Sequence, residues 1–287
     1  ICHLEGYKEL IMKVNKSNWP KNPKIIFTSS SHIHNDKFKL WCAEKVENKT
    51  KLIIGQHGGG LTTSLFSSHF DHELNVADKY LAWGKENFNI KKIVSFFNFK
   101  MIGRDKNLKK KNTKKVLIIL NSYSQYSYAL KGSIISSQYS NYLQNIFEII
   151  KAISINKKIE FKLRLHKEDY DWYTYDRIKE KFSDVEIDKG ENDCLEEMKE
   201  SSLCISTTNT TTYLESLYLN IPTLIYFDKK FDQVSLSAQK DFDKLRKIGL
   251  FYDDPQELSK KINKISSDIP NWWKSNCPGG LYFLNCS

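Results

Sequence analysis

The chain has 287 residues, a length typical of two domains rather than one. Its composition is 40% hydrophobic and 13% aromatic, which is enough apolar material for folded cores and excludes a wholly disordered chain. Lys and Arg number 44 against 34 Asp and Glu, so the formal net charge is +10 and favours polyanionic partners: nucleic acid, phosphorylated ligands or an anionic membrane surface. No apolar run approaches the roughly 20 residues of a membrane helix, which excludes a spanning segment.

Six cysteines are widely spaced and include no Cys-x-x-Cys pair. They predict reduced, mostly buried thiols of a cytoplasmic protein rather than a disulfide framework: Cys2, Cys42, Cys194, Cys204, Cys277 and Cys286. The first residue is Ile1 rather than Met, and we expect a further segment upstream of it. The lack of a signal peptide therefore excludes little.

The elements predicted before residue 100 alternate as in a βαβ unit. Residues 24–28 predict a buried strand, residues 36–47 a helix and residues 51–55 a second buried strand. A glycine-rich segment, residues 56–60, follows at once. This order favours a parallel sheet.

A lysine-rich stretch, residues 100–115, follows this pattern. It contains Lys109–Lys111, Lys114 and Lys115, and a charge run of this kind is typical of a solvated linker. We therefore predict two domains, residues 1–108 and residues 109–287.

The alternation of strands and helices repeats after the linker. Strands are predicted at residues 116–120, 159–165, 203–206 and 222–227, and helices at residues 139–153, 193–200, 210–219 and 255–265, with Trp272 and Trp273 packing after the last. Strands that alternate with helices predict an α/β protein with two Rossmann-like domains.

The glycine-rich segment is the first candidate site: Gln56, His57, Gly58, Gly59 and Gly60. It follows a buried strand, and in open α/β sheets ligands bind beyond the carboxyl ends of the strands. Three glycines would let the backbone approach an anion closely and take positive φ. His57 could transfer a proton near neutral pH or donate to a phosphate. The alternative is a tight turn with a packed histidine, and the Gly-Lys-Ser/Thr ending of a Walker loop is absent.

A threonine-rich segment between a strand and an amphipathic helix is the second candidate: Thr208, Asn209, Thr210, Thr211 and Thr212, followed by Glu215. Hydroxyls and free N–H groups at a helix N-terminus make an anion site. Glu215 would lie within reach of a ribose hydroxyl. The spacing from Thr212 to Glu215 also fits a capping box, and both interpretations can hold.

Arg164 and His166 follow a predicted strand and alternate onto one side. They could face a phosphate or diphosphate. The alternative is a surface ion pair of Arg164 with Glu168 or Asp169.

Histidines and carboxylates near the glycine-rich segment give weaker signals. The pairs His32 with His34 and His69 with His72 form no strong zinc pattern, so we expect no bound metal. Carboxylates flank the segment in sequence, and one of them could act as a base or nucleophile: Asp36, Glu44, Asp71 and Glu73.

Several of these motifs, in this order, resemble a transferase family from bacterial surface-carbohydrate loci that was first described in leptospires. The resemblance covers residues 27–273. It rests on His34-Asn35-Asp36, Trp41, Ala43-Glu44-Lys45, Gln56-His57-Gly58-Gly59-Gly60, Asp71-His72-Glu73, Trp83-Gly84, Thr208 to Glu215, Asn220-Ile221-Pro222-Thr223 and Trp272-Trp273.

The resemblance implies a GT-B-like architecture, in which two Rossmann-like domains with parallel sheets face a cleft. It also implies a sugar transferred from a nucleotide donor during lipopolysaccharide, O-antigen or capsule synthesis. The family is similar to bacterial Kdo transferases, which use CMP-Kdo, and more distantly to CDP-glycerol glycerophosphotransferases. A CMP-linked donor is therefore favoured, with no further cofactor. The start is shorter than in longer members, and residues 277–287 do not match the expected helix.

The resemblance assigns roles to the candidate residues. Thr210–Thr212 would hold the donor phosphate and Glu215 the ribose, with Arg164 and His166 nearby. His57 would act as general base or stabilise the leaving phosphate. The carboxylate role would fall to Glu44 or Asp71.

The expected protein is therefore a cytoplasmic glycosyltransferase acting on a glycan or lipid-linked acceptor, with peripheral contact at the inner membrane left open. One alternative is a CDP-glycerol-type glycerophosphotransferase, and another is a catalytically inactive scaffold. A third is a basic nucleic-acid-binding protein using residues 109–115. Because the sequence has no RNP motif, helix-turn-helix signal or zinc finger, we expect no nucleic-acid partner.

Overall fold

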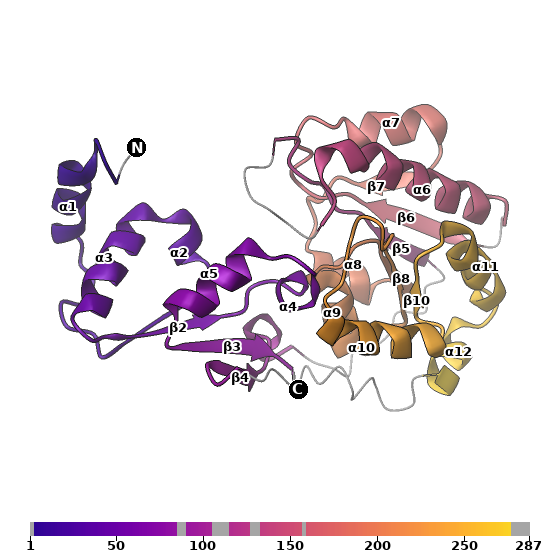
Figure 1. Ribbon diagram of the computed structural model, residues 1–287. Coiled ribbons are helices and arrows are strands. Elements are labelled where there is room, and N and C mark those ends of the chain that lie inside the picture. Colours follow the sequence, from indigo (N-terminus) through magenta and orange to yellow (C-terminus); the bar gives the residue numbers. More distant parts are fainter. Residues whose placement is uncertain (1–2, 85–89, 105–114, 127–132, 157–158, 277–287) are drawn as a thin grey trace. The chain divides into compact units, whose positions relative to one another are not determined.

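The computed structural model describes residues 3–84, 90–104, 115–126, 133–156 and 159–276 (Figure 1). They form two compact units: unit 1 comprises Ile1–His57 and His69–Asn98, and unit 2 comprises Gly58–Ser68 and Phe99–Ser287. The boundary predicted at residue 108, the lysines at 109–114 and the ending at 277–287 lie outside the described residues.

Unit 1 is a four-stranded parallel sheet in the order β1-β2-β3-β4. Its elements are α1 (Tyr7–Asn15), β1 (Ile25–Thr28), α2 (Ser31–His34), α3 (Asp36–Glu47), β2 (Lys51–Gly55), α5 (Ser68–Val76), β3 (Lys79–Trp83) and β4 (Ile93–Phe96). The 3-10 turn η1 (Phe99–Met101) that follows belongs to unit 2. The parallel pairing of β1 with β2 and the helix between them are confirmed. The helix α3 begins at Asp36 because the side chain of Asn35 accepts a hydrogen bond from the Phe38 N–H at 3.1 Å.

The core of unit 1 lies on one face of its sheet. Alternate strand residues such as Ile26, Ile54 and Tyr80 pack with Leu10 of α1 and Trp41 of α3. This packing fixes the carboxyl end of β2, from which the glycine-rich segment leaves.

Unit 2 is a six-stranded parallel sheet in the order β10-β9-β8-β5-β6-β7. Its elements are α4 (Gly60–Thr63), β5 (Lys115–Ile119), α6 (Ser136–Ser154), β6 (Glu160–Arg164), α7 (Thr174–Lys181), β7 (Glu186–Asp188), α8 (Cys194–Lys199), β8 (Leu203–Ser206), α9 (Thr211–Tyr218), β9 (Thr223–Tyr226), α10 (Leu236–Lys247), β10 (Phe251–Tyr252), α11 (Pro255–Ile265) and α12 (Ile269–Asn276). Each strand and helix predicted after the linker is confirmed within a few residues at its ends.

The chain of unit 2 reverses direction across its sheet. From β5 it proceeds outward to β6 and β7, then returns to β8 on the other side of β5 and continues to β9 and β10. This is the doubly wound order, in which ligands bind outside the carboxyl ends of the strands where the order reverses. In unit 2 that place lies between β5 and β8.

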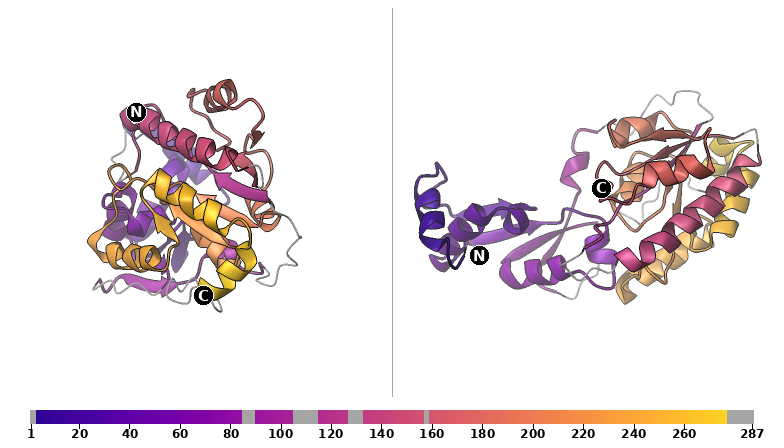
Figure 2. Two further views of the ribbon diagram at one scale, coloured as in Figure 1. Left: turned by 90° about the vertical axis from the view of Figure 1, so that its right-hand side faces the viewer. Right: turned by 90° about the horizontal axis from the view of Figure 1, so that it is seen from above.

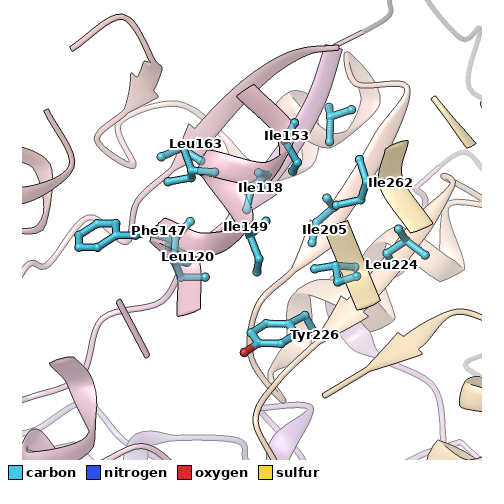
Figure 3. Packing of buried hydrophobic residues seen from close by; sticks show 14 of the residues in the cluster. Ile118, Leu120, Phe147, Ile149, Ile153, Leu163, Ile205, Leu224, Tyr226 and Ile262 are labelled. Atoms are coloured by element: carbon cyan, nitrogen blue, oxygen red, sulfur yellow. The ribbon is translucent and has the colours of Figure 1, made fainter. Parts of the chain in front are cut away.

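Helices cover both faces of this sheet. On one face α6 and α11 lie side by side (Figures 1 and 2). Ile118 and Ile205 of adjacent strands pack there against Ile149 of α6 and Ile262 of α11 (Figure 3). On the other face, α8, α9 and α10 bury the alternate strand residues. The strands β5, β8 and β9 are therefore buried on both sides, as the continuous apolar runs of the sequence predict.

Residues 58–68 belong to unit 2 although unit 1 lies on either side of them in the chain. The Leu65 N–H donates to the Gln233 carbonyl at 2.8 Å, and the Ser235 N–H donates to the Thr63 carbonyl at 2.8 Å. Ser64 and Val234 form an antiparallel bridge between these contacts. The glycine-rich segment therefore leaves unit 1 at His57 and is anchored in unit 2.

Three of the predicted thiols fall on described residues. Cys42, Cys194 and Cys204 are free, and Cys42 and Cys204 are buried. The prediction of reduced cysteines is confirmed at these positions, while Cys2, Cys277 and Cys286 lie outside the described residues.

Candidate functional site

The ends of β5 and β8 are tied together where the strand order of unit 2 reverses. The Thr207 hydroxyl donates to the Ile119 carbonyl at 2.7 Å. The Tyr142 hydroxyl lies 2.7 Å from Thr207 Oγ1 and accepts the Asn121 N–H at 3.1 Å. Burial raises the pKa of Tyr142 far above its usual range, so the phenol stays a neutral donor. These contacts fix the ends of β5 and β8, from which the chain continues to the start of α9.

The threonines at the start of α9 form a chain of hydroxyls. Thr210 Oγ1 lies 3.2 Å from Thr208 Oγ1 and 3.0 Å from Thr212 Oγ1. Thr210 is the N-cap residue, yet its side chain makes no capping hydrogen bond. The capping box between Thr212 and Glu215 is wrong, because α9 already begins at Thr211.

Asn209 is buried and holds this segment to its neighbours. Its N–H donates to Asp232 Oδ2 at 3.0 Å, and its side-chain oxygen accepts from the Thr63 hydroxyl at 2.9 Å and from the Tyr213 hydroxyl at 3.2 Å. Asp232 is 1% exposed, and burial raises its pKa to about 6. The start of α9 is therefore built on a network of buried polar groups.

The glycine-rich segment packs directly on the start of α9. The Gly59 N–H donates to Thr211 Oγ1 at 3.1 Å. A β-carbon at Gly59 would lie 2.8 Å from the Thr210 carbonyl oxygen, and one at Gly60 would lie 2.5 Å from that of Asn209. The prediction of positive φ is wrong for Gly58, Gly59 and Gly60, since the glycines with positive φ in the described part of the chain are Gly84, Gly103, Gly190 and Gly249. Glycine is required at positions 59 and 60 because the backbone there approaches α9 so closely.

Glu215 lies one turn into α9 and already has a partner. It is 2% exposed, and its carboxylate forms an ion pair of 2.6 Å with Lys100 Nζ. Burial raises the pKa of Glu215, while Lys100 acts in the opposite direction. The ribose contact stays a prediction, and it would compete with Lys100.

Arg164 and His166 differ in their surroundings. Arg164 is buried, pairs with Asp188 and donates to the Asn192 carbonyl at 2.7 Å. His166 is exposed, and its Nδ1 lies 3.1 Å from the Glu168 N. The surface ion pair of Arg164 with Glu168 or Asp169 is wrong, because the partner belongs to the adjacent strand β7. A phosphate role for Arg164 stays a prediction.

At the end of β2, Gln56 is buried rather than open to solvent. Its side-chain oxygen accepts the Trp83 N–H at 2.7 Å, which joins the ends of β2 and β3. Gln56 therefore positions the residue that follows it, and direct ligand binding by its side chain stays a prediction.

His57 lies beside a buried carboxylate within unit 1. Its Nδ1 is 3.7 Å from Oε1 of Glu73, and the same oxygen is 3.0 Å from Nε2 of His32. The side chain of Glu73 is fully buried, whereas that of His57 is 27% exposed. Burial lowers the pKa of His57, and the Glu73 carboxylate opposes this. His57 is therefore suited to be neutral near pH 7.

The carboxylates predicted for catalysis lie elsewhere in unit 1. Glu44 is half-buried on α3, and Asp71 is exposed on α5. Asp71 and Glu73 are two residues apart on one helix and so point to opposite sides. The burial of Glu73 could have been predicted from the sequence, because it lies at helical spacing from the apolar residues Phe70, Leu74 and Ala77.

Among the described residues, no group of three or more His, Cys, Asp or Glu side chains is arranged to hold a metal ion. No helix in this part of the chain has the length and apolar character needed to cross a membrane.

Comparison with protein families gives a match over residues 1–277, to a model described as LIC12162 family transferase. The chain belongs to the LIC12162 family. This match confirms the predicted resemblance to a transferase family. No curated protein matches the sequence.

Solved structures resemble this member of the LIC12162 family at low sequence identity. S. aureus MnaA in a co-structure with UDP has a TM-score of 0.56 at 11% identity, covering 94% of this chain and 71% of that one. The wall teichoic acid polymerase TagF, H444N variant, has a TM-score of 0.46 at 12% identity, covering 94% and 79%. The spinosyn rhamnosyltransferase SpnG has a TM-score of 0.48 at 9% identity, covering 94% and 69%.

The similarity to MnaA agrees with the sheets described above. The protein is an α/β transferase with two parallel sheets and a GT-B-like fold, as predicted.

Proposed function

We propose that this protein is a glycosyltransferase that moves a sugar from a nucleotide donor to a surface-glycan acceptor. The observation that carries the proposal is the start of α9, which lies where the strand order of the unit 2 sheet reverses. Doubly wound sheets bind ligands at this place. The membership in a transferase family and the GT-B-like fold support the same assignment.

The proposed donor site uses the first turn of α9. Backbone N–H groups and the helix dipole favour an anion there, and the hydroxyls of Thr210 and Thr212 are half-buried at the same end. MnaA was solved with UDP, which supports a pyrimidine nucleotide. The resemblance to Kdo transferases favours CMP and a Kdo-like sugar.

In the proposed reaction, His57 removes the proton of the acceptor hydroxyl. That oxygen bonds to the anomeric carbon of the sugar, and the bond from this carbon to the phosphate oxygen breaks. The leaving phosphate keeps the electron pair. The lowered pKa of His57 leaves its imidazole free to accept the proton.

Isothermal titration of the full chain tests the donor site. Thr212→Val removes a hydroxyl at nearly constant shape, and we expect the Kd for CMP to rise about ten-fold, as for a lost hydrogen bond to a charged group. Thr174→Val is the matched control, since Thr174 begins a different helix, α7. Equal effects of the two variants on CMP binding would refute the donor site.

A transfer assay tests the reaction. His57→Ala is expected to lower kcat by about 10²–10⁴-fold, the usual contribution of a general base. Undiminished turnover would remove His57 from the mechanism. Titration with CMP-Kdo and with CDP-glycerol, followed by product analysis, separates glycosyl transfer from glycerophosphate transfer.

A further inference from the structure

A carboxylate between two imidazoles lies inside unit 1, outside the proposed donor site. Glu73 of α5 is fully buried, and its Oε1 faces His32 of α2 at 3.0 Å and His57 at 3.7 Å. His32 is itself 7% exposed. The same carboxylate oxygen thus lies near a buried histidine and a partly exposed histidine.

Burying the Glu73 carboxylate costs folding free energy that packing alone would not explain. Its Oε2 is buried and has no hydrogen-bond partner among the described residues. A buried, ionised carboxylate is tolerated only when it is paired, and an apolar side chain of similar volume would often stabilise the fold more. The position of Glu73 is therefore better explained by its effect on the neighbouring imidazoles.

The geometry assigns different tasks to the two histidines. His32 lies at hydrogen-bonding distance and is enclosed, so it anchors the carboxylate in one orientation. His57 turns Nδ1 toward the same oxygen, which favours the tautomer that carries its proton on Nδ1. Its Nε2 is then left with the lone pair that a base needs. A separation of 3.7 Å is longer than a hydrogen bond, and such contacts often tighten only when substrate binds.

We propose that Glu73 and His32 are positioning residues for His57. Glu73 selects the tautomer of His57 and stabilises the imidazolium that forms when His57 takes a proton, and His32 holds Glu73 in place. This inference rests on the proposed function in making His57 the base. The other ionisable groups that act on His57 are His69 of α5 and His34 of α2, and both oppose its protonation.

The first test is nuclear magnetic resonance of the ¹⁵N-histidine-labelled full chain. We expect the Nδ1–H tautomer of His57 in the wild-type protein. In Glu73→Gln the pKa of His57 should fall, because the carboxylate that favours the imidazolium is gone. Glu47→Gln, an exposed carboxylate on α3, is the matched control and should leave the pKa of His57 unchanged.

Turnover provides the second readout. Glu73→Gln should lower kcat by about 10²-fold or more, within the range of general base catalysis, and move the acidic limb of the pH–rate profile to lower pH. The Kd for CMP should stay within about two-fold of the wild-type value, since the proposed donor site is in unit 2. A loss of kcat with no shift of the pH profile would indicate a merely structural role and overturn the proposal.

The resonance measurement separates the two hypotheses. If the wild-type chain transfers no sugar, the proposed function fails, while the tautomer and pKa of His57 still test the positioning pair. If Glu73→Gln does not fold, the tautomer of His57 in the wild-type protein tests the inference. A proton on Nε2 rather than Nδ1 of His57 would refute it.

Discussion

Replacing Gly60 by alanine tests the close packing of the glycine-rich segment on α9. The new β-carbon would lie 2.5 Å from the Asn209 carbonyl oxygen, about 0.9 Å closer than the 3.4 Å at which ordinary contact begins. A backbone oxygen cannot rotate away, so α4 must move. The movement would strain the hydrogen bonds of Gly59 with Thr211 and of Thr63 with Asn209. Overpacking of this kind costs about 1–3 kcal/mol in the free energy of unfolding.

Thermal unfolding of the full chain measures this cost. For a protein of this size, about 1–3 kcal/mol lowers Tm by roughly 2–12 °C. Gly58→Ala is the matched control, because its β-carbon would meet Leu61 at an ordinary 3.6 Å. We expect Gly58→Ala to leave Tm unchanged or slightly raised, since alanine restricts the unfolded chain. Equal Tm values for the two variants would refute the close approach of Gly60 to α9.

Three further outcomes are expected. Burial raises the pKa of Asp232 from 3.8 to about 6, so the native state binds this proton more tightly than the unfolded chain and loses stability as pH rises from about 4 to 6; Asp232→Asn should remove a component on the order of 3 kcal/mol from the pH dependence of urea unfolding, and an unchanged dependence would contradict this. Burial raises the pKa of the Cys204 thiol to about 12, so peptide mapping after iodoacetamide treatment at pH 8 should find Cys204 unlabelled in the native protein and labelled in urea. Ile205→Ala opens space in the unit 2 core and should cost about 2–5 kcal/mol by urea unfolding, whereas Leu236→Ala, at an 88% exposed position, should cost little.

The strands β5, β8 and β9 could be predicted because they are buried on both faces, whereas the short strands β7 and β10 were not predicted. A strand such as residues 203–206 is apolar along nearly its whole length, so it is evident without knowledge of its neighbours. The reversal of strand order between β5 and β8 depends on pairings between distant parts of the chain, which local patterns do not encode. In unit 1, β3 and β4 were missed because each is short and mixes apolar with polar residues.

The candidate site was predicted by residue type more than by geometry. Within unit 2, Gly59 contacts Thr211 of the threonine-rich segment. Only the family resemblance suggested that these two segments come together. Asp71 was predicted to be catalytic rather than Glu73. The prediction did not use the helical spacing of the Asp71-His72-Glu73 motif, which buries Glu73 and leaves Asp71 exposed. The pairing of Arg164 with Asp188 was missed because β7 was not predicted.

The passage of residues 58–68 into unit 2 limits how this enzyme can be divided, in the laboratory or by recombination. A polypeptide starting at Phe99 would lack the chain that pairs with Gln233 and Ser235 and that covers the start of α9. An exchange of C-terminal halves between relatives would likewise join one parent's threonine-rich helix to the other parent's glycines. The two segments must therefore come from the same parent, although Gly59 and Thr211 are 152 positions apart in the sequence.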